Sequence, residues 1–153
     1  MTSEHGKDVA LQKAIDLGLD ACVECSGCKC GVGIDLKNKV VIITGASRGL
    51  GRKLAFDLAK KKAKLVLFSR NQKDLIEVKR IIVKKYKGKV ITVDGDISDF
   101  HDVKRLFLKC MKEYEKIDIL ICNAGVNYKK PFYELEEAEW NSIFNTNVKG
   151  VFL

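Results

Sequence analysis

The chain has 153 residues, of which 46% are hydrophobic and 31% are charged. This balance predicts one soluble globular domain with a real core and excludes a chain that is disordered throughout. No apolar run approaches the length of a membrane span, and acids stand near the N-terminus where a secretory signal peptide needs an apolar stretch. We therefore expect a cytoplasmic protein without a membrane partner.

Lysine supplies most of the net charge of +8. A basic excess can indicate nucleic-acid binding. The lysine runs are short, however, and no aromatic residues interleave with them to stack on bases. Lysines near helix C-termini also interact favourably with the helix dipole. We therefore expect solvated helix ends and no nucleic-acid partner, and keep a basic nucleic-acid-binding protein as one alternative.

Residues 1–35 differ from the rest because they contain four of the six cysteines and no strand pattern. We interpret them as an N-terminal extension that is flexible. Four thiolates so close together could hold zinc or part of an iron–sulfur cluster, but their spacing matches neither a zinc knuckle nor a ferredoxin run. A tail with reactive thiols, or residues ahead of a start near Ile34, are the alternatives. We expect no bound metal; the only candidate ligands are Cys22, Cys25, Cys28 and Cys30.

From residue 36 onward, short apolar runs alternate with helical periodicities. Apolar runs bounded by turn residues are typical of buried parallel strands. The predicted strands are 40–43, 65–68, 90–93 and 117–122. Repeated strand–helix alternation with right-handed crossovers predicts an α/β fold with helices on both faces of the sheet. We expect a doubly wound, Rossmann-type parallel sheet of about four strands in the order 3-2-1-4.

Helical spacing of apolar residues follows each strand. Leu50, Leu54 and Leu58 predict one face of a helix that ends in a lysine run. Further helices are predicted over about 75–82, over 103–114 with an N-cap at Ser98 or Asp99, and from about Glu136 to Leu153. The two remaining cysteines lie in apolar patterns and are expected to be small core residues: Cys110 and Cys122.

A glycine-rich segment, TGASRGLG, stands where the first strand passes into the first helix. Gly45 permits a tight turn, Gly49 lets the backbone approach a pyrophosphate, and Gly51 permits close packing of helix on strand. The helix start directs free N–H groups at phosphate. Both flanking elements that such a loop needs are predicted. We expect this segment to bind a dinucleotide through Thr44, Gly45, Ser47, Arg48, Gly49, Leu50 and Gly51.

With its TGxxxGxG spacing, the chain resembles the short-chain dehydrogenase/reductase family from about residue 36 to 153. Three further motifs follow in the family's order: Asp96-Ile97-Ser98, Cys122-Asn123-Ala124-Gly125 and Asn145-Thr146-Asn147-Val148. The second differs from the family's NNAG by a cysteine in place of the first asparagine. The chain is most similar in look to 3-oxoacyl-carrier-protein reductases, which identifies no substrate.

The resemblance implies roles for single residues. It places the adenine ring at Asp96 and Ile97, and further cofactor contacts at Asn123, Ala124 and Gly125. It makes Asn147 a residue of the catalytic site. It implies an NAD(P)-binding Rossmann domain over 36–153, hydride transfer between the cofactor and a small carbonyl or alcohol substrate, and a homo-oligomer when complete.

The family's catalytic serine and Tyr-x-x-x-Lys pair are not found: no tyrosine of the chain has lysine four positions later. We therefore expect a domain that is incomplete at its C-terminus and inactive by itself, either a fragment of an enzyme or the product of a truncated gene. A non-catalytic dinucleotide-binding module is the alternative. Without the next helix, the chain is expected to associate through its exposed apolar surface.

The choice of cofactor depends on the end of the second strand. In NAD-specific relatives an acid there bonds the ribose hydroxyls. The corresponding residue here is Ser69, followed by Arg70, with Arg48 in the glycine loop. Two guanidinium groups can bind a phosphate dianion by charge-assisted hydrogen bonds. We expect NADP rather than NAD.

Overall fold

The computed structural model describes residues 35–153, and the N-terminal cysteine cluster lies outside these residues. Four parallel strands form one sheet in the order β3-β2-β1-β4, as the sequence predicted. The strands are β1 (Val40–Thr44), β2 (Lys64–Ser69), β3 (Val90–Asp94) and β4 (Ile119–Ile121). The central position of β1 and β2 explains their composition, because a strand with neighbours on both sides and helices on both faces is buried throughout.

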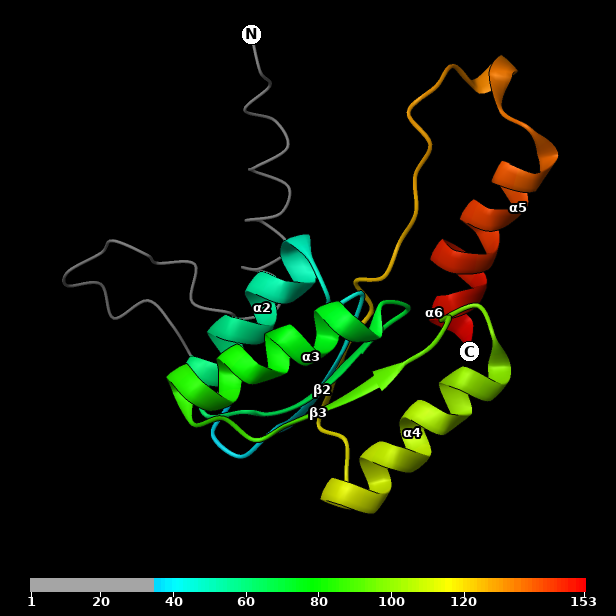
Figure 1. Cartoon of the computed structure of the whole chain (residues 1–153). Coiled ribbons are helices and arrows are strands. Elements are labelled where there is room, and N and C mark those ends of the chain that lie inside the picture. The colour runs from blue at the N-terminus through cyan, green and yellow to red at the C-terminus, as the bar shows by residue number, and fades with distance from the viewer. Residues whose placement is uncertain (1–34) are drawn as a thin grey trace, which may run out of the picture. The chain divides into compact units, whose positions relative to one another are not determined.

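Helices cover both faces of the sheet, with α2 and α3 on one face and α4 on the other (Figure 1). The helical segments are α2 (Gly49–Lys60), α3 (Gln72–Ile81), η1 (Ile82–Tyr86), α4 (Phe100–Tyr114), η2 (Phe132–Glu134), α5 (Glu137–Phe144), η3 (Asn145–Lys149) and α6 (Gly150–Phe152). The π-helical segments η1 and η3 continue α3 and α5 and were not predicted. The expected last helix therefore exists, with a π-helical stretch inside it.

Side-chain caps determine where α3 and α4 begin. The Asn71 side chain accepts the N–H of Asp74, and the Asp99 side chain accepts that of Asp102. Each cap satisfies a backbone donor that the helix itself leaves free. Of the two N-caps that the sequence offered for α4, the structure has Asp99.

The buried face of α2 differs from the prediction. Gly51, Ala55, Leu58 and Ala59 face the sheet, whereas Leu50 is 54% exposed. Small residues allow the helix axis to approach β1 and β2 closely, and this places the glycine loop directly against the sheet. Leu50 lies in the first turn and lines the pocket described below.

The core beneath α4 joins β1, β2 and β3 to the apolar stripe of that helix. Its buried members are Val40, Ile42, Val66, Phe68, Val93, Leu106 and Cys110. Cys110 is thus the small core residue that was expected. The same expectation for Cys122 was wrong, because that cysteine is exposed. It follows β4, which pairs with β1 alone among the strands of residues 35–153, so one side of β4 has no neighbouring strand.

Asp118 fastens the start of β4 to the start of β1. Its carboxylate accepts the Val40 N–H at 2.7 Å and forms ion pairs with Lys116 and Lys39. The Val40 hydrogen bond, followed by the one from Lys116, lowers the pKa of Asp118 from 3.8 to about 2.

We expect this contact to make stability dependent on pH. A carboxyl whose pKa is lower in the folded than in the unfolded state stabilises the fold above the unfolded pKa, and the contribution is lost as the pH falls through the folded one. The difference in unfolding free energy between wild type and Asp118→Asn should be constant above about pH 5 and shrink between 3.8 and about 2. Urea unfolding at several pH values measures it. A difference that persists at pH 2 would contradict the assignment.

Within residues 35–153, no helix is both long and apolar enough to cross a membrane.

Candidate functional site

The glycine loop between β1 and α2 forms the floor of the candidate site. Gly45 and Gly49 have φ angles of 64° and 56°, in the left-handed region that favours glycine. A Cβ on Gly45 would lie 2.9 Å from the Ala124 Cα, so the loop packs backbone to backbone against the segment after β4. A Cβ on Gly49 would meet nothing within 4 Å. Gly45 is therefore required for space as well as conformation, and Gly49 for conformation alone.

The N-terminus of α2 has no internal partner for its positive end. Its N-cap residue, Arg48, makes no side-chain cap, and no acidic residue lies in its first turn. By contrast, α3 and α4 have both a side-chain cap and an aspartate in that position. Free N–H groups and the helix dipole therefore favour an anion at the start of α2.

Asn123 locks the glycine loop to the end of β4. Its amide donates to the carbonyl oxygens of Thr44 at 2.9 Å and Gly45 at 3.2 Å. A Cβ on Gly51 would lie 2.4 Å from the Gly45 oxygen and 2.5 Å from the Asn123 amide nitrogen. Only glycine at position 51 allows α2 to rest on this contact, which fixes the helix start relative to the sheet.

Thr44 completes the contact from beneath. Its hydroxyl, which is buried, accepts the N–H groups of Asn123 at 3.0 Å and Ala124 at 2.9 Å. We expect Thr44→Val to lower the unfolding free energy by about 2 kcal/mol, because two partly buried donors lose their acceptor. Urea unfolding measures the loss, and Thr44→Ser, which keeps the hydroxyl, should retain most of the stability. Equal stability of the valine and serine variants would contradict this role.

A pocket of about 420 Å³ opens where the four strands end. It brings together eleven of the predicted cofactor residues: Gly45, Ser47, Arg48, Leu50, Ser69, Arg70, Asp96, Ile97, Asn123, Ala124 and Gly125. Thr44, Gly49 and Gly51 do not line it. Thr44 and Gly51 support its floor through the contacts just described. The carboxyl ends of parallel strands are where open α/β sheets bind ligands.

Ser69 and Arg70 form one corner of the pocket. Ser69 is 9% exposed, and within residues 35–153 its buried Oγ has no hydrogen-bond partner. A buried hydroxyl without a partner costs free energy, so a ligand oxygen at this corner would satisfy it. Neither Arg70 nor Arg48 forms an ion pair within the same residues, and both side chains are exposed at the pocket. The corner thus offers one hydroxyl and two free cations.

Asp96 provides an acceptor on the opposite side, after β3. Burial acts to raise the pKa of its carboxyl, but the two hydrogen bonds from Ser98 and the charge of Arg70 prevail and lower that pKa. Ser98 donates through N–H at 2.9 Å and through Oγ at 2.7 Å, both to Oδ1. Asp96 is therefore ionised near neutral pH and accepts hydrogen bonds.

Asn147 lies beside the pocket and does not line it. Its side chain accepts the Val126 N–H and donates to the Val126 carbonyl, both at 2.9 Å. A Cβ on Gly125 would lie 3.3 Å from the Asn147 Oδ1. Asn147 thus ties the π-helical segment η3 to the loop after β4.

Six lining residues were missed by sequence reasoning: Phe68, Asn71, Asp74, Gly95, Val126 and Thr146. Two of them carried a usable signal, because Asn71 and Asp74 form the capped first turn of α3 directly after the Ser69-Arg70 pair. Asp74 brings a carboxylate to the pocket that was not expected there. In the part of the chain that the structure covers, no group of three metal-ligating side chains occurs.

The strand order and the pocket at the strand ends define a Rossmann-type domain. The chain belongs to the short-chain dehydrogenase family, whose model matches residues 39–153. This confirms the resemblance that the motifs indicated.

Among curated relatives, an uncharacterized oxidoreductase of Listeria monocytogenes is 40% identical over 116 residues, which are 76% of this chain and 46% of that protein. The chain thus spans about half the length of the curated relatives it matches. The alcohol dehydrogenase of Thermococcus sibiricus complexed with 5-hydroxy-NADP has a TM-score of 0.73 and 30% identity, over 76% of this chain and 49% of that one. The 3-ketoacyl-(acyl-carrier-protein) reductase of Brucella melitensis complexed with NADH has a TM-score of 0.72 and 34% identity, over 77% and 47%.

Proposed function

We propose that this chain is the cofactor-binding part of an NADP-dependent oxidoreductase that moves a hydride between the cofactor and a small carbonyl or alcohol substrate. Family membership and the NADP analogue and NADH in two structural relatives support a nicotinamide dinucleotide. The observation that carries the choice of NADP is the buried, unpartnered Ser69 hydroxyl beside Arg70 and Arg48.

The residues present fit such a cofactor. The uncapped start of α2 suits a pyrophosphate, and the charged Asp96 with Ile97 suits an adenine ring. The corner of Ser69 and the two arginines suits a 2′-phosphate dianion. An aspartate at position 69 would repel that phosphate, and the serine does not. Asp74 on the same wall is the one lining charge that opposes it.

In the proposed enzyme the bound cofactor supplies the hydride, and the side chains of this chain orient it. Asn123 holds the glycine loop against β4, which keeps the α2 start in place. Asn147, through its paired hydrogen bonds to Val126, fixes the loop that forms the pocket's far wall. We assign Asn147 to the catalytic site on this basis. Substrate contact, homo-oligomer formation and a cytoplasmic location are proposed for the whole protein.

A second candidate is a module that binds the dinucleotide and turns over no substrate. It is favoured by one observation: none of the tyrosines in the 153 residues is followed by lysine at the fourth position. In that case binding would be kept and no NADPH oxidation would accompany any carbonyl.

Calorimetric titration of the 153-residue chain with NADPH and with NADH tests the proposal. We expect binding of both, with NADPH the tighter ligand. Equal affinities would reject the choice of NADP, and no binding of either would reject the cofactor function. Turnover assays with a panel of small ketones and aldehydes then separate the enzyme from the non-catalytic module.

A further inference from the structure

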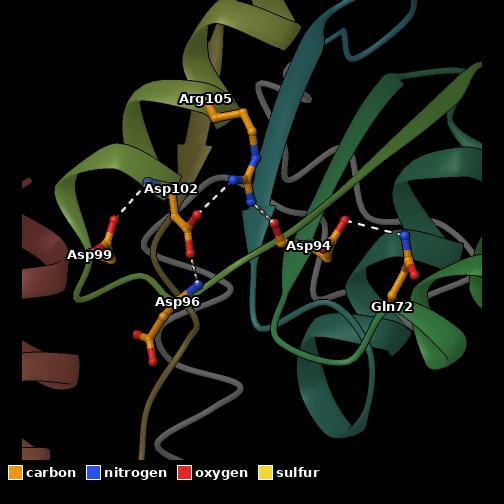
Figure 2. A network of polar contacts seen from close by, with 6 residues as sticks. All are labelled: Gln72, Asp94, Asp96, Asp99, Asp102 and Arg105. Atoms are coloured by element: carbon orange, nitrogen blue, oxygen red, sulfur yellow. Dashed lines mark hydrogen bonds and ion pairs between the residues drawn. The ribbon is translucent and has the colours of Figure 1, made fainter.

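Two side chains of α4 hold the loop between β3 and α4 on both sides of Gly95 (Figure 2). The Asp102 Oδ2 accepts the Asp96 N–H at 2.8 Å. The Arg105 guanidinium donates to the Asp94 carbonyl oxygen and pairs with the Asp102 Oδ1, with an N···O distance of 2.8 Å. The peptide groups before and after Gly95 are therefore tied to one carboxylate–guanidinium pair.

Gly95 makes this approach possible. A Cβ at this position would lie 2.9 Å from both the carboxyl carbon and the Oδ2 of Asp102. The Gly95 N–H donates to the Ser69 carbonyl oxygen at 3.1 Å. The loop is thus joined to the Ser69 corner on one side and to α4 on the other.

Asp102 is not needed to cap its own helix. Asp99 already caps α4 by accepting the Asp102 N–H at 3.0 Å. In a capping box, the acid at the third helical position would accept the N–H of the N-cap residue. Here the Asp99 N–H donates instead to the Asp96 carbonyl at 3.1 Å, and the Asp102 carboxylate reaches on to the Asp96 N–H. Its bonding capacity is therefore directed to the segment that lines the pocket.

The Asp96 carboxylate points away from Asp102 (Figure 2). Its Oδ1 is occupied by the two hydrogen bonds from Ser98. No hydrogen bond to its Oδ2 occurs within residues 35–153, and Asp96 lines the pocket. The direction of this carboxylate depends on its own peptide group, which the Asp102 contact fixes.

We propose that Asp102, braced by Arg105, is a positioning residue that fixes the Gly95–Asp96 peptide and so aims the Asp96 carboxylate at the exocyclic amine of the adenine ring. The inference rests on the proposed dinucleotide function. Asp102 acts through Asp96 and does not line the pocket.

The test uses the 153-residue chain and two probes: NADPH, and its hypoxanthine analogue, in which a carbonyl oxygen replaces the adenine amine. Wild type should bind NADPH roughly tenfold more tightly than the analogue, since a charged acceptor receives the amine. Asp102→Ala should weaken NADPH binding roughly tenfold and bring the two probes to nearly equal affinity. Asp102→Asn keeps an acceptor for the N–H and should fall between. A merely structural role would lower the melting temperature and leave the affinity ratio unchanged.

Asp57→Ala is the matched control. Asp57 forms an ion pair with Lys60 of the same spacing and length, 2.8 Å, on α2 and away from the pocket. This variant should keep both the affinity and the ratio. Hydrogen exchange of the Asp96 amide, measured without ligand, should accelerate in Asp102→Ala alone, and it gives a result even if that variant binds neither probe.

The outcomes separate the two proposals. No binding of NADPH by wild type overturns both. Wild-type binding with an unchanged probe ratio in Asp102→Ala, or with no acceleration of Asp96 exchange, overturns only the positioning role. A wild type that does not distinguish the probes also overturns it, because the Asp96 carboxylate then receives no amine.

Discussion

Replacing Ser69 by aspartate together with Arg70 by alanine is expected to reverse the cofactor preference of the chain. Wild type offers the 2′-phosphate a buried hydroxyl and the charges of Arg70 and Arg48. Hydrogen bonds to charged groups typically contribute about 1.5–3 kcal/mol each. Two of them correspond to a preference for NADPH over NADH of about a hundredfold or more.

The double variant removes one cation and places a carboxylate where the phosphate would lie. The aspartate can accept both ribose hydroxyls of NADH. We therefore expect NADPH affinity to fall by about a hundredfold and NADH affinity to rise, as measured by calorimetric titration.

Arg80→Ala provides the control for the change in net charge. Arg80 is an exposed arginine of α3 that does not line the pocket. If its loss weakened NADPH as much as the loss of Arg70, the preference would reflect the general positive field and the specific corner would be disproved. Equal binding of both cofactors by wild type would have the same consequence.

Gly51→Ala is expected to produce the largest loss of stability, about 3 kcal/mol. The added methyl would lie 2.4 Å from a backbone oxygen of the glycine loop, which a side-chain rotation cannot relieve. The start of α2 must therefore move away from Gly45 and Asn123. Because that helix start forms part of the proposed phosphate site, NADPH binding should be lost together with stability. Urea unfolding and titration measure the two effects.

Gly49→Ala separates space from conformation. A methyl there meets nothing within 4 Å, so only the positive φ of 56° opposes it. That conformation costs an L-residue about 1 kcal/mol. A loss for Gly51→Ala no greater than that for Gly49→Ala would refute the close approach of α2 to the glycine loop.

The sequence alone was sufficient for the sheet. The apolar runs at 40–43 and 65–68 lie in β1 and β2, and the predicted strand order is the observed one. Burial on both faces forces a strand to be apolar throughout, and the handedness of crossovers restricts the order, so both features can be read from local patterns. The glycine loop was predicted for the same reason, since positive φ angles and helix starts require particular residue types at fixed spacing.

Contacts between separate loops were decided only by the tertiary structure. Leu50 fits a helix stripe by spacing, yet the tight packing of Gly51 and Ala55 turns it to the pocket. Cys122 fits a core pattern, but it follows a strand with a single neighbour and is exposed. Thr146 and Asp102 carry no local signal at all. The strand register and helix placement set which loops meet at the sheet edge, and this positions Thr146 in the pocket wall and the Asp102 carboxylate on the Asp96 N–H.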